Sequence, residues 1–207
     1  MADLEQKAKF IYNSNRLDGV HVPFEKTLEI VQAPPDPLSE SVELEAMDGQ
    51  KQHARSVVLS HRDALDFVER LSRSPQVTEA HIREIHRRLM DGVILSNGEF
   101  RECTLKYKAL PPLAPEEIPA RLARVVAIMN QGFERAKDKA ILAWQVHHEF
   151  IYVHPFIEGN GRTARLLLQL MRMRAGLGIE IVPFAEHERY LRSIVEYGRK
   201  LAAARGE

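Results

Sequence analysis

Residues 154–165 combine side chains that could accept a proton with a backbone that could bind phosphate. They read His-Pro-Phe-Ile-Glu-Gly-Asn-Gly-Arg-Thr-Ala-Arg. Gly159 and Gly161 can adopt positive φ values without a Cβ clash, so the backbone N–H groups between them can form a concave anion-binding nest. Helix-forming residues follow, which would place the nest at a helix N-terminus, where unpaired donors and the dipole favour negative charge. The sequence therefore predicts a phosphate-binding loop.

His154 lies at the start of this loop, and its ordinary pKa allows it to take up a proton near neutral pH. We interpret it as a general base for a Ser, Thr or Tyr hydroxyl that attacks phosphorus, a role typically worth ~10²- to 10⁴-fold in rate. The alternative is a histidine exposed to solvent or capping the core. The surrounding loop favours the catalytic role.

The remaining polar side chains of the loop suit a nucleoside triphosphate and a metal ion. Glu158 offers carboxylate oxygens to Mg²⁺, which prefers one or two carboxylates together with substrate phosphates and water, although the helix dipole alone also favours an acid here. Asn160 can donate its amide to a phosphate oxygen. Arg162 and Arg165 share a helix face and offer planar forks for phosphate. Two cations at a helix start oppose the dipole unless an anion compensates them.

Composition excludes several classes of protein. The 207 residues are 44% hydrophobic and 28% charged, which is ordinary for one globular domain. The net charge is zero, so no general attraction to nucleic acid or to an acidic membrane is expected. Cys103 is the single cysteine, and the N-terminus lacks the pattern of a signal peptide. We expect a cytoplasmic protein without a membrane span; a homodimer is compatible with the sequence, which does not predict the oligomeric state.

Hydrophobic spacing predicts an all-α domain. A short helix over residues 3–17 ends at Asp18-Gly19, and the prolines of residues 33–37 form a loop. Thr78 is the expected N-cap of a core helix that continues to Asp91. Further helices are expected over residues 56–71, 115–132, 136–152, 162–175 and 183–204. Between residues 97 and 112, the two-residue alternation of Phe100, Cys103, Leu105 and Tyr107 predicts one small β-hairpin.

The loop resembles, position for position, the signature HPFx(D/E)GNGRxxR of the Fic family. Ile85–Met90, Gly98–Arg101 and the Trp144–Phe150 helix are also similar to Fic proteins, so the resemblance covers most of the chain. It implies a Fic-type helical bundle and a protein adenylyltransferase that uses ATP and Mg²⁺. His154 would be its base, Glu158 its metal ligand, and its nucleotide-binding residues would be Gly159, Asn160, Gly161, Arg162 and Arg165. Tyr190 and Tyr197 lie where family members place residues near the adenine.

The resemblance leaves other activities open. The expected reaction transfers AMP to a hydroxyl of a protein substrate, and the intact Gly-Asn-Gly-Arg favours this over the kinase branch of the family. The alternatives are an enzyme that removes AMP and a nucleotide-gated binding module with the same fold. No nucleic-acid or membrane partner is expected.

Two accessory features are also implied by the resemblance. The hairpin would be a flap that holds the target peptide by strand addition, its candidate residues being Glu102, Cys103, Thr104, Leu105 and Lys106. Ser14–Gly19 resembles the inhibitory motif (S/T)xxxE(G/N), with Asp18 in place of the glutamate, so residues 1–33 would be an inhibitory helix segment and residues 34–207 the catalytic part of one compact domain. The shorter carboxylate predicts a loose or water-bridged pair with Arg165. A plain helix stop at Asp18 and Gly19 is the alternative reading.

Overall fold

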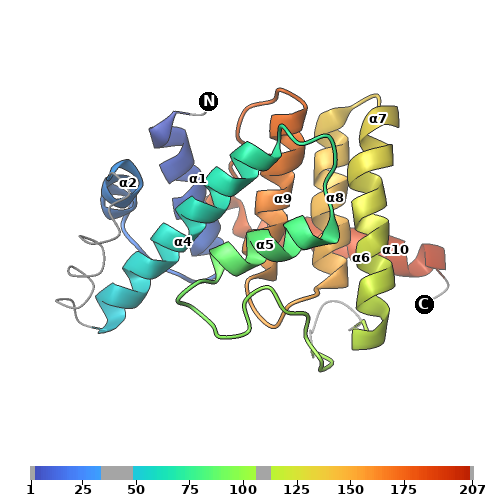
Figure 1. Cartoon of the computed structure of the whole chain (residues 1–207), viewed down its shortest axis with the longest axis horizontal. Helices are drawn as coiled ribbons and strands as arrows, with labels where there is room; N and C mark the ends of the chain where they lie inside the picture. The colour runs from blue at the N-terminus through green and yellow to red at the C-terminus, as the bar shows by residue number, and fades with distance from the viewer. Residues whose placement is uncertain (1–2, 34–48, 106–112, 206–207) are drawn as a thin grey trace.

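A computed structural model describes residues 3–33, 49–105 and 113–205 of the chain (Figure 1). Within these ranges 3₁₀-turns span Pro115–Glu117 and Phe184–Glu186, and a π-helical turn spans Ile128–Gly132. No β-strand occurs among the described residues, so the all-α prediction is confirmed. The helices are α1 (Leu4–Leu17), α2 (Phe24–Gln32), α4 (Gly49–Leu71), α5 (Glu79–Leu89), α6 (Ile118–Ala127), α7 (Phe133–Arg135), α8 (Lys139–Val153), α9 (Asn160–Arg174) and α10 (His187–Arg205).

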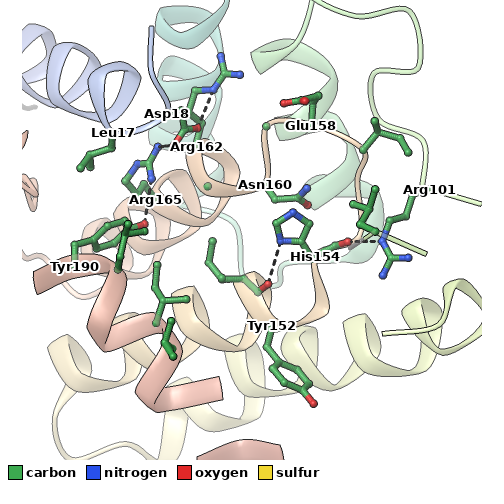
Figure 2. A pocket seen from close by; sticks show the side chains of 18 of the residues that line it. Leu17, Asp18, Arg101, Tyr152, His154, Glu158, Asn160, Arg162, Arg165 and Tyr190 are labelled. Atoms are coloured by element: carbon green, nitrogen blue, oxygen red, sulfur yellow. Dashed lines mark hydrogen bonds and ion pairs between the residues drawn. The ribbon is translucent and has the colours of Figure 1, made fainter. Parts of the chain in front are cut away.

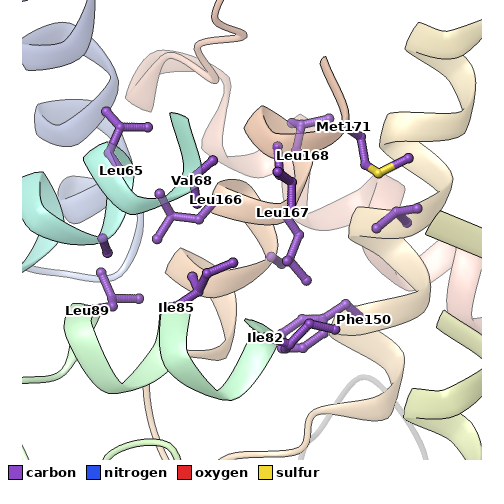
Figure 3. Close-up of a cluster of buried hydrophobic side chains, with 14 of the residues drawn as sticks. Leu65, Val68, Ile82, Ile85, Leu89, Phe150, Leu166, Leu167, Leu168 and Met171 are labelled. Carbon is purple, nitrogen blue, oxygen red and sulfur yellow. The ribbon is translucent and has the colours of Figure 1, made fainter. Parts of the chain in front are cut away.

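Helix α9 lies at the centre of the fold and packs along α8, with α4 and α5 against it (Figures 1 and 3). Its leucines are buried on every side of the helix, as expected of a core helix that has neighbours all round. Hydrophobic residues at helical spacing on the neighbouring helices are fully buried as well: Val57, Val58, Leu65 and Val68 on α4, and Ile82, Ile85 and Leu89 on α5. This packing fixes the start of α9, and hence the loop before it, relative to the rest of the molecule.

The N-terminal helix α1 packs against α2, α4, α9 and the 3₁₀-turn Phe184–Glu186. A buried hydrogen bond of 2.9 Å joins Asn15 Oδ1 to Nδ1 of His61 on α4. The final residues of α1 lie beside the first turn of α9. The division of the chain at residue 33 stays a prediction, because the following residues lie outside the described ranges.

Several helix boundaries differ from the sequence prediction. Helix α2 was not expected; it is short and includes β-branched Thr27, Ile30 and Val31, but it buries these three residues on one face. Thr78 caps α5 through its side chain as predicted. The predicted 115–132 helix is α6 with a 3₁₀-turn before it and a π-helical turn after it. Helix α10 begins only after the other 3₁₀-turn, Phe184–Glu186. No helix in the described part of the chain is long and apolar enough to cross a membrane.

The predicted hairpin is not seen in the part of it that the structure describes, residues 97–105. Residues 101–105 form a bend rather than a strand, because the hydrogen bonds of this segment go to the Arg101 side chain and to the loop before α9 instead of to a partner strand. The rest of the predicted flap, including Lys106 and Tyr107, lies outside the described residues.

Candidate active site

A cavity of about 440 Å³ opens beside the loop between α8 and α9 (Figure 2). The loop supplies one wall of the cavity, and the end of α1, the first half of α10 and the segment around Arg101 supply the others. The predicted residues His154, Glu158, Gly159, Asn160, Gly161, Arg162, Arg165 and Asp18 all line this one cavity, as does Leu105.

His154 is the C-cap of α8 and has a left-handed backbone, with φ 48° and ψ 58°. The imidazole Nδ1 lies 3.3 Å from the Ile151 carbonyl. Because a carbonyl only accepts hydrogen bonds, Nδ1 carries the proton and Nε2 carries the lone pair. The pKa of His154 is lowered to about 4, chiefly by burial and also by nearby Arg101, although the Ile151 carbonyl and Asp18 oppose this shift. The ring is therefore neutral at neutral pH and able to accept a proton.

The two loop glycines have different tasks. Gly159 has φ +73° and is the N-cap of α9; a Cβ there would lie 2.5 Å from Met90 Sδ. Gly161 does not have the positive φ that we predicted, because it already lies in the first turn of α9. A Cβ on Gly161 would lie 2.9 Å from Asp18 Oδ1. Gly161 thus makes room for the α1 carboxylate.

Asn160 holds the loop together. Its Oδ1 accepts the Phe156 N–H at 3.0 Å, and its Nδ2 donates to the Phe156 carbonyl at 2.7 Å. The side chain is 2% exposed. The amide oxygen and one N–H therefore close the turn that leads into α9, and donation of the other N–H to a phosphate stays a prediction.

The loop also rests on His86 of α5, a residue that we had not predicted as functional. Gly98 N donates to His86 Nδ1 at 2.8 Å, so the proton is on Nε2, which donates to the Glu158 carbonyl at 3.0 Å. The ring stacks on Phe156 with centroids 3.6 Å apart. Both bonds require a neutral ring, and burial lowers the pKa of His86 to about 4.

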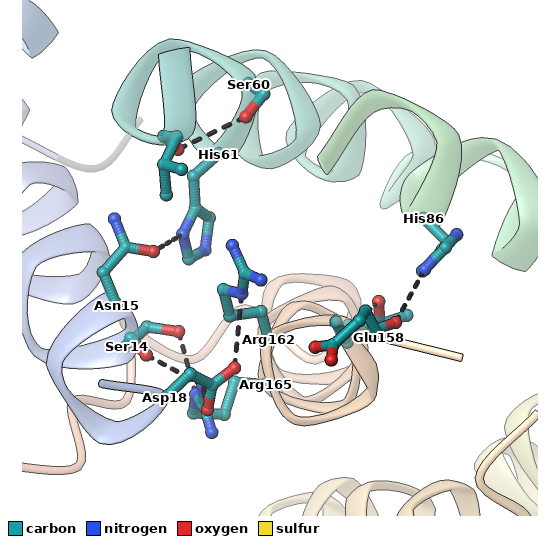
Figure 4. A network of polar contacts seen from close by, with 12 residues as sticks. Ser14, Asn15, Asp18, Ser60, His61, His86, Glu158, Arg162 and Arg165 are labelled. Carbon is teal, nitrogen blue, oxygen red and sulfur yellow. Dashed lines mark hydrogen bonds and ion pairs between the residues drawn. The ribbon is translucent and has the colours of Figure 1, made fainter. Parts of the chain in front are cut away.

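The Asp18 carboxylate bridges the two arginines of α9 (Figure 4). Asp18 Oδ1 is 2.7 Å from Arg165 Nη2, and Oδ2 is 3.2 Å from Arg162 Nε. The expectation of a loose or water-bridged pair with Arg165 was wrong. Asp18 is the C-cap of α1, and its carboxylate lies against Gly161, whose missing side chain leaves the room that the shorter acid needs to reach Arg165.

Arg165 has further partners on both sides. Ser14 of α1 accepts two of its hydrogen bonds, one at Oγ and one at its carbonyl, each 2.8 Å long. The Tyr190 hydroxyl on α10 accepts from Nη1 at 3.1 Å and is 2.9 Å from Nε2 of buried His147. Burial lowers the pKa of Arg165, but Asp18 and Tyr190 outweigh it, and the net pKa is raised. Every partner of this guanidinium in Figures 2 and 4 therefore favours its charged form.

Arg162 is 5% exposed, and its Nη1 is a buried atom with no hydrogen-bond partner among the described residues. Burial lowers the pKa of this guanidinium, opposed by Asp18. The one Asp18 carboxylate thus neutralises only part of the charge of two buried guanidiniums. The two arginines together retain positive charge beside the cavity. The two arginines at the start of α9 therefore remain suited to an anion of more than one charge.

Glu158 is exposed at the rim of the cavity, and its carboxylate makes no hydrogen bond or ion pair within the described residues. No group of three or more potential metal-ligating side chains occurs in the described ranges. A single free carboxylate fits Mg²⁺ only if phosphates and water complete its coordination, which is the usual arrangement for this ion with a nucleotide.

The segment around Arg101 borders the cavity. Glu102, Cys103 and Thr104 are exposed, whereas Leu105 is half-buried and lines the cavity. Gly19 follows the C-cap of α1 with φ +81°. Tyr197, which the resemblance placed near adenine with Tyr190, does not line the cavity; its hydroxyl donates to Glu149 at 3.1 Å.

Comparison with known proteins gives a consistent set of relatives. The Fic/DOC family model matches residues 76–171. The protein adenylyltransferase Fic of Drosophila willistoni is 26% identical over 191 residues, covering 91% of this chain and 36% of that protein. The protein adenylyltransferase fic-1 of Caenorhabditis briggsae is 36% identical over 114 residues, 55% of this chain and 22% of that protein.

The solved structure of Fic-1 from C. elegans, residues 134–508, has a TM-score of 0.76 and is 26% identical, covering 91% of this chain and 54% of that one. The chain thus spans about a third or less of the length of the two curated relatives above. The family match includes α5, α8, most of α9 and the loop that carries His154. With this match and this fold, residues 76–171 of the chain belong to the Fic/DOC family.

Proposed function

We propose that this chain is a protein adenylyltransferase, which transfers AMP from ATP to a Ser, Thr or Tyr hydroxyl of a target protein. The observation that carries the proposal is the position of neutral His154 in the same cavity as Arg162, Arg165 and the start of α9. This cavity combines a proton acceptor with cationic and dipolar phosphate sites. The names of the two adenylyltransferase relatives support the same reaction.

The proposed step forms one P–O bond and breaks another. The target hydroxyl oxygen attacks the α-phosphorus of ATP as His154 Nε2 takes its proton, and pyrophosphate leaves on the opposite side. The phosphates raise the pKa of His154 from about 4 toward neutrality, because an anion favours the protonated ring. Arg162, Arg165 and the α9 N-terminus bind the phosphates.

Magnesium would be held by Glu158 together with the phosphates. When bound, this ion neutralises charge on the pyrophosphate leaving group. The chain itself contributes the orientation of Glu158, because His86 fixes the Glu158 carbonyl and Asn160 fixes the turn before it.

We further propose that α1 inhibits this reaction. The Asp18 carboxylate occupies the Arg165 guanidinium, which would otherwise be available to the terminal phosphate. Ser14 adds two hydrogen bonds to the same guanidinium. ATP binding in the productive orientation would therefore require these contacts to open.

The position of the label in ATP tests the proposed function. Protein incubated with Mg²⁺ and α-³²P-ATP should become labelled, or should label a band in a lysate, whereas γ-³²P-ATP should label nothing. His154→Ala should abolish the labelling while ATP still binds. The assay is repeated with Asp18→Ala, which lacks the proposed inhibitory carboxylate and should therefore give a stronger label. Transfer of the γ-label would indicate a kinase, and ATP binding without any transfer by either form would indicate a binding module. Release of AMP from a modified substrate would identify the reverse activity.

A further inference from the structure

Arg101 is a buried cation in the wall of the cavity and is 3% exposed. Its guanidinium donates to three backbone carbonyls: Nε to His154 at 2.8 Å, Nη1 to Cys103 at 2.7 Å, and Nη2 to Leu113 at 2.7 Å. Its backbone N–H donates to the Pro155 carbonyl at 2.9 Å. One residue therefore fixes the two carbonyls that follow the catalytic ring.

The His154 backbone needs such support. It is the sole non-glycine residue with positive φ among residues 3–33, 49–105 and 113–205. Left-handed backbone is unfavourable for a residue with a Cβ, and the proline that follows also biases this residue toward an extended conformation. Both preferences would turn the imidazole away from its present position. The two Arg101 hydrogen bonds to His154 and Pro155 oppose them.

The same guanidinium also holds Cys103 and Leu113 through their carbonyls. Leu105 and Leu113 line the cavity with His154. A shift of the guanidinium would therefore move the cavity wall and the histidine together. Three backbone carbonyls depend on one fork of N–H donors, which a lysine cannot reproduce.

We propose that Arg101 is a positioning residue that holds His154 in its left-handed conformation and joins it to the cavity wall formed by residues 103–105 and 113. The inference rests on the proposed function, because it concerns the orientation of the proton acceptor. Arg101 also lines the cavity, but its guanidinium donates to backbone carbonyls, so we assign it a role through His154. The cation also lowers the pKa of His154, after the larger effect of burial.

The first test uses histidine NMR and needs no enzymatic activity. The His154 ring signals are assigned by their loss in His154→Ala and are titrated in the wild type, Arg101→Met and Arg101→Lys. Arg101→Met should move the ring signals and raise the pKa of His154, because the neighbouring cation is gone. Arg101→Lys should move the signals with a smaller change in pKa. The control is Arg174→Met, since Arg174 also donates to two backbone carbonyls, those of Met129 and Pro75.

The second test measures transfer of AMP from α-³²P-ATP to the protein itself. Arg101→Lys should lower the rate by roughly 10- to 100-fold, the order of loss expected from a ~1 Å displacement of a catalytic group. Its dissociation constant for ATP should change little, because the phosphate-binding residues are intact. Arg174→Lys should keep the wild-type rate. A folded Arg101→Lys or Arg101→Met protein with unchanged His154 signals would overturn the inference. Absence of transfer by the wild type would instead contradict the proposed function, and the NMR result would still decide the role of Arg101.

Discussion

Asp18 Oδ1 lies 2.7 Å from Arg165 Nη2, although aspartate is one methylene shorter than the glutamate of the family motif. The side chain of Asp18 is 24% exposed, and that of Arg165 is 3% exposed. The pair is thus shielded on the arginine side and is reinforced by the second contact, from Asp18 to Arg162. Such a bridge is stronger than an exposed ion pair.

The inhibitory role of Asp18 predicts faster self-modification when its carboxylate is removed. A hydrogen bond to a charged partner is worth about 1.5–3 kcal/mol, so Asp18→Ala should raise the transfer rate by roughly 10- to 100-fold. This exceeds the few-fold effect expected of an exposed pair. Labelling from α-³²P-ATP measures the rate, and Asp3→Ala, at the other end of α1, is the matched control. Equal rates in wild type and Asp18→Ala would leave Ser14–Gly19 as a helix end.

The direct contact also changes the outcome expected for Asp18→Glu. The longer side chain would restore the family's inhibitory residue, but its carboxylate would have to move outward, because Gly161 already limits the space beside Asp18. Asp18→Glu should therefore inhibit no better than Asp18, and its transfer rate should equal or exceed that of the wild type. A clearly lower rate would show that α1 can shift to accept the extra methylene.

The loop and the helix faces could be predicted because the information for them is local. The twelve residues from His154 to Arg165 are contiguous, and the buried faces of α4 and α5 follow helical spacing. The supports of the loop could not be predicted in this way. His86 contacts Glu158 across 72 positions, and Arg101 contacts His154 across 53. Only the packing of α5 against α9 brings such residues together. The similarity of Gly98–Arg101 to Fic proteins was the one feature of the sequence that pointed to Arg101.

Side-chain length was a poor guide to the Asp18 contact for a similar reason. The comparison of aspartate with glutamate assumed a fixed backbone separation, whereas the missing Cβ of Gly161 lets the end of α1 come closer. The structural role of Asn160 was missed because its amide was assigned to a ligand alone, before the backbone groups of Phe156 were considered as partners. Buried backbone groups require partners, and a short loop often finds them in its own side chains.

Loss of the metal ligand Glu158 should lower the transfer rate, and excess Mg²⁺ should partly restore that rate. Glu158→Gln keeps the size of the side chain and loses its charge, so transfer should fall, and the Mg²⁺ concentration for half-maximal rate should rise. Glu102→Gln, an exposed acid of the neighbouring segment, is the control. High Mg²⁺ should raise the rate of Glu158→Gln but not that of His154→Ala. An unchanged Mg²⁺ dependence in Glu158→Gln would remove Glu158 from the metal site.

The Tyr190 hydroxyl should contribute both stability and phosphate binding. Tyr190→Phe leaves Arg165 Nη1 and His147 Nε2 without this partner, which should cost about 1–2 kcal/mol of unfolding free energy and lower Tm by roughly 2–8 °C. ATP affinity should weaken because the Arg165 guanidinium is less well oriented. Tyr197→Phe, on the same helix but outside the cavity lining, should leave ATP affinity unchanged. Isothermal titration of both variants with ATP distinguishes the two positions.

Buried neutral histidines predict loss of stability in mild acid. The pKa values of His86 and His154 are about 4, and those of His61 and His147 are lowered well below 6.5, in each case chiefly by burial. The unfolded chain binds protons at these histidines near pH 6.5 while the folded chain does not. The contribution of the neutral histidines to the free energy of unfolding is therefore complete above pH 6.5 and declines as the pH falls toward 4. At pH values well below 6.5, each histidine lowers the free energy of unfolding by about 1.4 kcal/mol for every unit by which the pH falls.

Urea unfolding between pH 8 and pH 5 measures this decline. The free energy of unfolding should be nearly constant from pH 8 to 7 and should then fall with a slope of several kcal/mol per unit near pH 5.5, the sum of the four sites. His61→Asn removes one of these sites, and Asn15, which bonds His61, remains on α1. The variant should be less stable than the wild type at pH 8, but its stability should fall less steeply with acid, by about one histidine's share. A parallel decline in both proteins would mean that His61 becomes protonated in the folded state, and the acid sensitivity would then come from the other three histidines.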